Sequence, residues 1–318
     1  CALAAAERLR LLAPDEMARR MEATLATLEA LPKWQGHLYN WYDTRTLEPL
    51  EPPFISSVDS GNLAACLLTC AQGVRVLLPQ LSACYHSLAA RMDALAEGMR
   101  FTALFDAEAE LFRIGVHPLE ESPSPGHYDL LASESRLLSF VAIMLGQAPV
   151  RHWWRLGRLY TRVRGAGQTL ISYNGTMFEY LMPLLFQPTV PLTLLDGVCR
   201  AAVKAQARCR RGGVFGVSES GYYAFDPNLY YLYKAFGLPR LSLDPDQRSD
   251  VIAPYATFLA MQTDLKSAFQ NLLRLMSLGM EGPLGMFEAA DFSPARTDGQ
   301  PMRIVRSHMA HHQGMILL

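Results

Sequence analysis

The sequence predicts an all-α fold in which helices form one toroid and long loops build the functional site. Three observations predict this: apolar residues recur at helical spacing, convincing strand patterns are few, and the connecting loops are long and rich in Pro, Gly, Asp and aromatic residues. The 318 residues, 50% of them hydrophobic, are enough for a large core. No linker, low-complexity tract or charge block divides them, so we expect residues 1–318 to be a single domain, with any strands confined to short hairpins.

The expected helices follow from the spacing of apolar residues. Met17, Met21 and Leu25 recur on one helix face, and Pro32 marks where this helix must have ended. Ser60 is expected to cap a second helix that continues through the following leucines. Four further segments have the same periodicity: 128–145, 192–208, 250–262 and 263–280.

Charge and cysteine content exclude several classes of protein. The chain has 29 basic and 30 acidic residues and a net charge of -1, so it lacks the basic footprint of a nucleic-acid-binding protein. A neutral, hydroxyl-rich ligand needs no such footprint. The six cysteines form no C-x-x-C pair, and we interpret Cys66 and Cys70 as small buried apolar residues rather than as part of a disulfide framework.

The ends of the chain suggest a piece of something longer. It begins with Cys1 rather than Met and stops within an apolar pattern, and it lacks an uninterrupted apolar stretch of about 18 residues. We therefore expect a soluble segment without membrane contact of its own, with any membrane anchor or second catalytic unit outside it.

Two loops carry carboxylates that suit glycoside chemistry. Glu219 stands between two serines in a glycine-rich loop, and Glu288 and Asp291 stand among apolar and aromatic residues in another. One carboxyl group can protonate a departing glycosidic oxygen while a second attacks the anomeric carbon or activates water. The alternatives are a surface glutamate in a flexible loop for Glu219 and a helix-starting glutamate for Glu288.

Other segments suggest contacts with a sugar. A loop that begins at Trp34 gathers aromatic rings, which stack on sugars, beside groups that bind hydroxyls, although an aromatic core corner would look the same. A second segment, 175–180, offers another carboxylate and aromatic ring. The expected substrate-binding residues of these two segments are Trp41, Tyr42, Asp43, Asp59, Asn62, Glu179 and Tyr180.

The C-terminal histidines raise the question of a metal. His308 and His312 are four residues apart, which is a ligand spacing on a helix, with His311 between them. No HExxH or HxxEH motif occurs, so we expect His311 and His312 to hydrogen-bond a substrate or a catalytic carboxylate, with no metal and no cofactor. The chain also lacks a G-x-S-x-G nucleophile elbow and a phosphate loop.

Several blocks together resemble the glucoamylase-like domain of cyclic β-1,2-glucan synthases. They occur in the expected order over nearly the whole chain: NWYDTRTLEPL (40–50), VDSGN (58–62), GTMFEYLMPLL (175–185), GVSES (216–220), VIAPYAT (251–257), FEAADFSPAR (287–296) and MAHHQGM (309–315). Two positions depart from the family pattern: Phe215 stands where a Trp is expected, and Tyr173-Asn174 replaces a Trp-Ser pair. We expect these two departures to change how sugar rings stack on the site.

The resemblance implies an (α/α)6 barrel that acts on β-1,2-glucan. It places the catalytic pair on Glu219, as acid/base, and Glu288, as nucleophile, and it adds Tyr222, Asp291, His311 and His312 to the expected substrate contacts. The implied reaction is a retaining transglycosylation that closes linear glucan into a ring. The segment would belong to a larger membrane protein, on the cytoplasmic side of the inner membrane, with further synthase domains as partners. An endo-β-1,2-glucanase and a non-catalytic glucan-binding module remain alternatives.

Overall fold

The computed structural model describes residues 1–77, 83–119, 122–246 and 250–318, which divide into two compact units. The first unit contains Cys1–Asp129 and Ser135–Gly157, and the second contains Leu130–Glu134 and Arg158–Leu318. Each unit is described by itself below.

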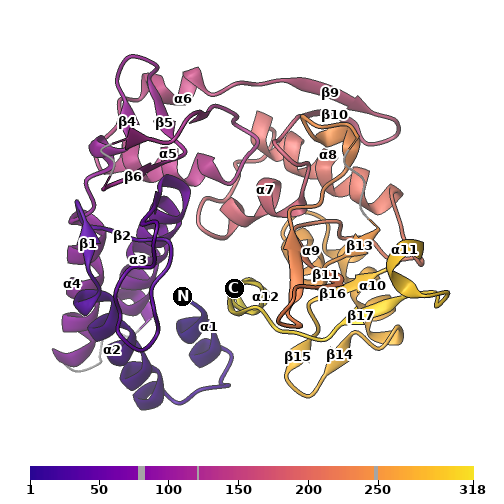
Figure 1. Cartoon of the computed structure of the whole chain (residues 1–318), viewed down its shortest axis with the longest axis horizontal. Coiled ribbons are helices and arrows are strands. Elements are labelled where there is room, and N and C mark those ends of the chain that lie inside the picture. The colour runs from indigo at the N-terminus through magenta and orange to yellow at the C-terminus, as the bar shows by residue number, and fades with distance from the viewer. Residues whose placement is uncertain (78–82, 120–121, 247–249) are drawn as a thin grey trace. The chain divides into compact units, whose positions relative to one another are not determined.

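The first unit is built around packed helices. In Figure 1 its α2, α3 and α4 run beside one another, and α3 also packs on α5. Helix α2 begins with a proline, has two acidic residues in its first turn, and buries Met17, Met21 and Leu25. The helices of this unit are α1 (Ala2–Arg8), α2 (Pro14–Ala30), α3 (Ser57–Leu77), α4 (Ala83–Glu97), the 3₁₀ helix η1 (Phe101–Ala103), α5 (Ser135–Met144) and α6 (Arg151–Arg155).

Short antiparallel strands connect these helices. They form a hairpin, β1–β2, and two three-stranded sheets in the orders β3-β6-β7 and β4-β5-β8. Their bounds are β1 (Lys33–Trp34), β2 (His37–Leu38), β3 (Ile55–Ser56), β4 (Phe105–Asp106), β5 (Leu111–Arg113), β6 (Gly115–His117), β7 (Ser122–Pro123) and β8 (His127–Tyr128).

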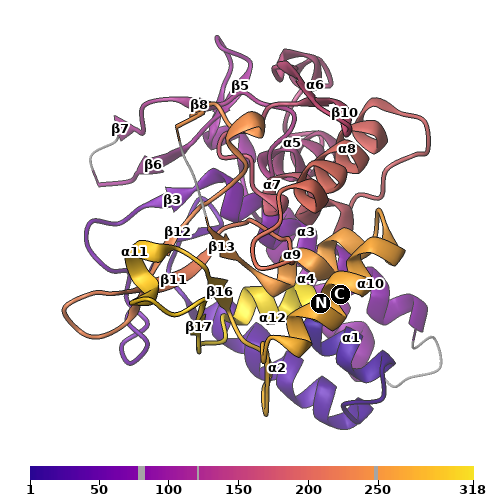
Figure 2. The ribbon, with the colours of Figure 1, turned by 90° about the vertical axis from the view of Figure 1, so that its right-hand side faces the viewer.

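The second unit carries its long helices beside small sheets. Helices α9 and α10 pack together, and α9 also contacts α7 and α12 (Figure 2). Helix α8 begins at the side-chain cap Thr193, and α10 begins at the cap Asp264. The helices are α7 (Met177–Leu181), η2 (Met182–Leu185), α8 (Leu194–Arg208), η3 (Pro239–Leu241), α9 (Pro254–Met261), α10 (Leu265–Ser277), α11 (Pro294–Thr297) and α12 (Ala310–Leu317).

The strands of the second unit bring distant loops together. The sheet β13-β16-β17 and the hairpin β11–β12 meet, since β11 contacts both β16 and β17. The other strands of this unit form the hairpins β9–β10 and β14–β15. The bounds are β9 (Tyr160–Val163), β10 (Gly167–Leu170), β11 (Ser220–Phe225), β12 (Tyr231–Lys234), β13 (Val251–Ile252), β14 (Glu281–Gly282), β15 (Gly285–Met286), β16 (Ala289–Asp291) and β17 (Arg303–Val305).

The sequence predicted the helices better than the strands. The expected helix that ends before Pro32 is found as α2, and those at 192–208, 250–262 and 263–280 are found as α8, α9 and α10, each shorter than expected. The expectation of an all-α fold was too narrow, because short strands border most of the long loops. The helix expected at 128–145 starts only at Ser135, since its first residue belongs to β8. Ser60 lies inside the first turn of α3 and donates to Ser56 O at 2.8 Å, so its expected capping role was wrong.

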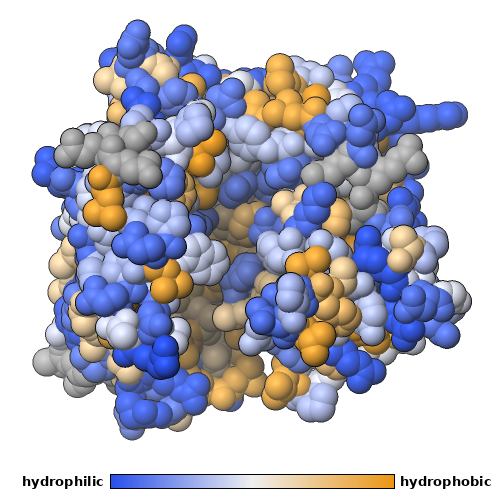
Figure 3. Space-filling view, viewed as in Figure 1, coloured by the Kyte–Doolittle hydropathy of each residue, from blue (hydrophilic) through white to orange (hydrophobic). Residues whose placement is uncertain are grey.

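The surface mixes polar and apolar side chains on the face shown in Figure 3. Among the described residues, the helices are all too short or too polar to cross a membrane.

Candidate functional site

Glu219 follows a loop whose backbone is bonded to two buried amide side chains. Asn271 of α10 accepts from Phe215 N at 2.9 Å and donates to Phe215 O at 2.8 Å. Gln206 of α8 likewise accepts from Val217 N at 2.9 Å and donates to Val217 O at 2.8 Å. The two amides thus supply the hydrogen bonds that a neighbouring strand would otherwise make. We call this arrangement the amide clamp; it fixes the path of the loop up to Glu219.

A glycine lies between the two clamped residues. Gly216 has a φ of +130°, and a Cβ built on it would lie 3.0 Å from Ala253 O. Both the backbone conformation and the close approach therefore require glycine at this position. This is the physical reason for the glycine that precedes the Ser-Glu-Ser triplet.

Two tyrosines hold Glu219 at the end of this loop. The hydroxyl of Tyr233, on β12, donates to Glu219 Oε1 at 2.9 Å. The hydroxyl of Tyr255, on α9, lies 3.0 Å from the backbone oxygen of Glu219 and 2.8 Å from Ser218 Oγ. Burial is the main cause that raises the pKa of both tyrosines, so both hydroxyls stay protonated and can donate. Glu219 itself is half-buried.

Glu288 lies immediately before β16 and is enclosed by protein donors. Gly221 N donates to its Oε1 at 3.1 Å, and His312 Nδ1 lies 2.9 and 3.0 Å from its two oxygens. The side chain has no exposed surface in this structure. The backbone N–H and the imidazole therefore fix the orientation of the Glu288 carboxyl group.

The two carboxylates are linked through Tyr233 and His312. His312 Nε2 lies 3.5 Å from the Tyr233 hydroxyl that donates to Glu219, while its Nδ1 faces Glu288. The imidazole is stacked on Tyr255 with ring centroids 3.8 Å apart and an interplanar angle of 13°. We call this series of contacts, Glu219–Tyr233–His312–Glu288, the carboxylate relay.

The histidines at the site differ in their surroundings. Loss of water around the ring, and then the neighbouring His312, lower the pKa of His311 to about 4, so this ring is neutral at pH 7. His311 Nε2 also lies 3.5 Å from the Tyr233 hydroxyl. His308 precedes the N-cap of α12, so the expected helical pairing of His308 with His312 was wrong.

The site could hold a metal ion as well. One ligand atom from each of Glu219, His311 and His312 lies within 4.8 Å of the others. Because His312 bonds Glu288 through Nδ1, its Nε2 would be the ligand, with Glu288 as the outer carboxylate that fixes the ring. A metal here would bind the carboxylate of Glu219, which the sequence predicts to be the acid/base, so the donor set suits an inhibitory ion more than a catalytic cofactor.

The structure adds a carboxylate that the sequence interpretation missed. Glu134 accepts from Ser133 Oγ at 3.0 Å. Burial, and then the charges of Glu179 and Glu219, raise the pKa of Glu134 to about 8. The chain therefore gathers three acidic side chains close enough to affect one another. The sequence did contain a signal for this residue, since Glu134, like Glu219, is the middle residue of a Ser-Glu-Ser triplet.

Several expected substrate contacts have protein partners in this structure. Glu179 forms a capping box with Thr176 at the start of α7, and burial raises its pKa. Tyr180 is buried and donates to Leu170 O at 2.7 Å. Asp291 is buried and ion-paired with Arg296, whose guanidinium lies 5.2 Å from the Tyr222 ring. A direct sugar contact by any of these four stays a prediction.

The expected aromatic loop lies in the first unit. Trp41 is 69% exposed and therefore has a free ring face for stacking. Tyr42 donates to Pro32 O, and the Asp43 carboxylate accepts from the N–H groups of Arg45 and Thr46, so these two shape the loop. Asp59 is exposed in the first turn of α3, and Asn62 Oδ1 is buried without a hydrogen-bond partner.

Comparison with known proteins gives a clear relationship. No protein-family model matches the chain. The chain is 31% identical to the cyclic β-(1,2)-glucan synthase NdvB of Rhizobium meliloti, over 95% of this chain but only 15% of that protein. The chain thus spans a small part of the curated relative that it matches.

Solved structures share its fold. A glucoamylase-like protein of Bacteroides caccae matches with a TM-score of 0.76 and 17% identity, over 99% of this chain and 78% of the other. An endo-β-1,2-glucanase of Chitinophaga pinensis, in complex with sophorotriose and glucose, matches with a TM-score of 0.74 and 16% identity over the same shares. The resemblance predicted from the sequence is confirmed: this chain is similar in sequence to a segment of a cyclic β-(1,2)-glucan synthase and similar in fold to glucoamylase-like proteins and endo-β-1,2-glucanases.

Proposed function

We propose that this chain is a glycoside-hydrolase-type enzyme that acts on β-1,2-glucan by retaining transglycosylation. The observation that carries the proposal is the carboxylate relay, because it places an accessible glutamate and an oriented glutamate in one contiguous set of contacts. A binding module would gain nothing from this arrangement. The substrate class is supported by the names of the sequence relative and of the glucanase that shares the fold.

In the first step Glu288 attacks the anomeric carbon while Glu219 gives its proton to the departing glycosidic oxygen. A covalent ester between Glu288 and the sugar results, and the leaving chain departs with a new hydroxyl group. Tyr233 positions the Glu219 carboxyl group, and His312 with Gly221 N positions the Glu288 carboxylate. Because the Glu288 side chain is fully covered, this step requires a local movement that exposes one of its oxygens.

In the second step Glu219 removes the proton from an incoming hydroxyl group, whose oxygen attacks the same carbon and releases Glu288. If the hydroxyl is the 2-OH of the chain's own non-reducing end, the product is a ring. The exposed ring of Trp41 is a candidate stacking surface for the glucan.

A second candidate is hydrolysis, in which water replaces the sugar hydroxyl in the second step. The fold shared with an endo-β-1,2-glucanase favours it. The same carboxylates serve both reactions, so the product decides between them.

We further propose that the helices form an (α/α)6 barrel and that residues 1–318 are one glucoamylase-like domain of a longer protein. The coverage of 15% of the synthase supports a longer parent with further domains. A position on the cytoplasmic side of the inner membrane belongs to the same proposal.

The test is mass spectrometry of products formed from purified linear β-1,2-glucan. Oligomers one water lighter than the linear ones would establish cyclisation, and shorter linear oligomers alone would establish hydrolysis.

Glu219→Gln and Glu288→Gln should each reduce turnover by at least about a thousandfold, because each removes a group that takes part in bond making or breaking. Full activity in either variant would contradict the assignment.

A further inference from the structure

The β11–β12 hairpin, which positions Glu219, also carries exposed aromatic side chains. Strand β11 begins directly after Glu219, and Tyr233 of β12 donates to the Glu219 carboxyl group. Among the described residues of the second unit, the exposed aromatic side chains are Phe225, Tyr230 and Tyr233 of this hairpin, together with Tyr160 and Phe269. Exposed rings are therefore concentrated beside the candidate acid/base.

The register of the hairpin decides which of these rings share a face. Tyr231 pairs with Phe225, and Tyr233 pairs with Gly221. Side chains alternate along a strand, and paired residues lie on the same face. Phe225 and Tyr231 therefore lie on the face that carries Tyr233, about 7 Å along the strand from it. Tyr230, next to Tyr231 in the sequence, lies on the opposite face.

Phe225 and Tyr231 belong to a preformed aromatic cluster. Their ring centroids lie 4.7 Å apart with an interplanar angle of 33°, and Tyr223 packs on the two rings with centroids at 5.4 and 5.9 Å. Arg303 Cζ, on β17, lies 5.5 Å from the centre of the Tyr223 ring. Phe225 is still 44% exposed, so part of its ring is available to a ligand. We call Tyr223, Phe225 and Tyr231 the aromatic platform.

The turn at the tip of the hairpin fixes the platform in place. The Asp226 carboxylate accepts from Asn228 N and from Tyr230 N, each at 2.9 Å, and Asp226 N donates to Tyr230 O at 2.9 Å. Within this turn Leu229 has a φ of +65°, a left-handed conformation that a leucine rarely adopts. Rings held by such a turn lose little freedom when a ligand binds.

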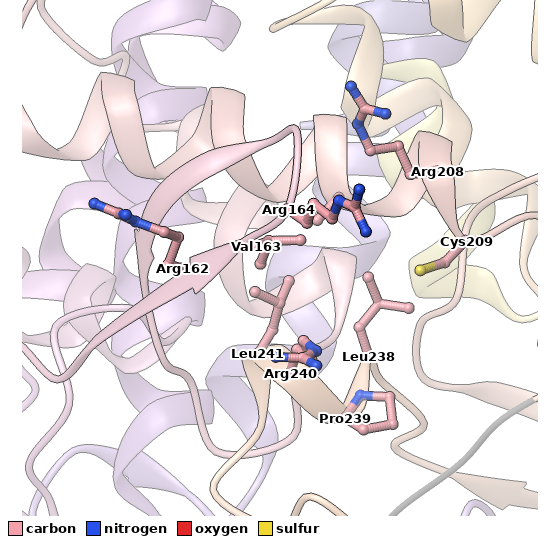
Figure 4. A pocket seen from close by; sticks show the side chains of 10 residues that line it. Arg162, Val163, Arg164, Arg208, Cys209, Leu238, Pro239, Arg240 and Leu241 are labelled. Carbon is pink, nitrogen blue, oxygen red and sulfur yellow. The ribbon is translucent and has the colours of Figure 1, made fainter.

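A groove elsewhere in the same unit lacks these features. It lies between the β9–β10 hairpin, the end of α8 and η3, and apolar side chains such as Val163, Leu238 and Leu241 line it (Figure 4). Its lining contains no aromatic ring and no candidate catalytic residue. Since the C–H face of a sugar packs best on a flat ring, the aromatic platform is the better surface for a glucan.

We propose that the aromatic platform binds the glucan chain beyond the two sugar units at the cleaved bond, with a glucosyl ring stacked on Phe225. The inference rests on the proposed function, from which it takes its substrate. A glucan segment held on the platform stays close to Glu219 after the first step, so its hydroxyl groups have a high effective concentration there. The platform thereby favours attack by a sugar hydroxyl over attack by water.

The experiment compares two affinities in the Glu219→Gln chain, which should bind glucan without turning it over. Calorimetric titration with linear β-1,2-glucan and with the disaccharide sophorose measures them. Phe225→Leu removes the flat ring but keeps an apolar side chain, and it should weaken binding of the linear glucan about three- to tenfold. The affinity for sophorose should not change, because a disaccharide fills only the positions at the cleaved bond.

Tyr230→Leu is the matched control, since it removes a ring that is 72% exposed on the opposite face of the same hairpin, and it should keep the affinity for the linear glucan. Phe225→Trp should keep it too, because it preserves an aromatic ring. Unchanged glucan affinity in Phe225→Leu, equal weakening in Tyr230→Leu, or an equal loss of sophorose affinity would overturn the platform alone. A Glu219→Gln chain that binds no linear glucan would overturn the proposed function and this inference with it.

Discussion

The carboxyl group of Glu219 is positioned by residues that lie far from it in the sequence. Tyr233 donates to this carboxyl group from β12, and Tyr255 lies against the backbone oxygen of Glu219 from α9. Sequence analysis singled out Glu219 and Glu288 from their glycine-rich and aromatic loops, and the resemblance to the glucoamylase-like domain predicted them as the catalytic pair. It missed both tyrosines, because a tyrosine in a hairpin or an apolar helix looks like part of the core until its hydroxyl partner is known.

Tyr233→Phe is expected to lower kcat about ten- to a hundredfold with little change in KM. The reason is the loss of a hydrogen bond to the Glu219 carboxyl group and of the contact with His312, while the ring itself is kept. Steady-state kinetics on linear β-1,2-glucan measure the effect. Tyr230→Phe is the matched control, since Tyr230 is 72% exposed on the same hairpin. An equal loss of kcat in both variants would mean that Tyr233 does not position Glu219.

Added zinc is expected to inhibit the enzyme, whereas EDTA should leave its activity unchanged. A Zn²⁺ ion held by Glu219, His311 and His312 would compete with proton transfer by Glu219. Inhibition constants for wild type and His311→Ala test this, and the variant should require at least about tenfold more zinc. An enzyme that EDTA inactivates would instead show that a metal is part of its chemistry.

Among the elements, the amide clamp shows how two helices control one loop. Gln206 comes from α8 and Asn271 from α10, and each satisfies both backbone groups of one loop residue. Neither amide could be assigned this role from the sequence, because polar residues on amphipathic helices usually face water. The helices themselves were predictable from their apolar periodicity.

Asn271→Ala is expected to destabilise the fold by about 2–4 kcal/mol. The change leaves Phe215 N and Phe215 O buried without their partners and also removes a bond to Thr257. Urea unfolding measures the loss, with the exposed neighbour variant Gln270→Ala as control. A change below about 1 kcal/mol would mean that water or a moved chain replaces the amide.

The short strands were harder to predict than the helices. Two- and three-residue strands such as β13 and β16 are too short for a period of two to be visible. Their pairing, Val251 with Asp291 and Ile252 with Ala290, depends on residues about 40 positions apart. The sequence predicted a helix from residue 250 where β13 is found and a loop where β16 is found, and it could not show that these two segments would pair.

On the scale of the whole molecule, buried ionisable groups make stability depend on pH. Burial lowers the pKa of His37 to about 4 and, with two neighbouring carboxylates, raises that of Glu134 to about 8. The unfolded chain binds a proton at His37 more readily between pH 4 and 6.5, so this contribution increases stability as pH rises. The folded chain keeps a proton on Glu134 between pH 4.5 and 8, so that contribution decreases stability as pH rises.

The free energy of unfolding of the wild-type protein is therefore expected to fall between pH 6.5 and 8. In this range Glu134 still contributes a pH dependence, whereas His37 no longer does. Glu134→Gln should reduce the loss, because the amide stays neutral throughout. Urea unfolding at several pH values measures the difference, which should be small near pH 5 and largest near pH 8. If the free energy of unfolding of the variant changed with pH in parallel with that of wild type, the result would contradict the raised pKa of Glu134.

The amide clamp also bears on how this enzyme could be diversified. Asn271 and Gln206 bond the main chain at residues 215 and 217, so these hydrogen bonds can form whichever side chains stand there. Phe215 and Val217 are themselves fully buried, so the exchanges that keep the path of the loop are those between apolar residues of similar volume. Laboratory libraries that place apolar residues at 215 and 217 while keeping both amides should therefore yield more folded variants than libraries that vary the amides.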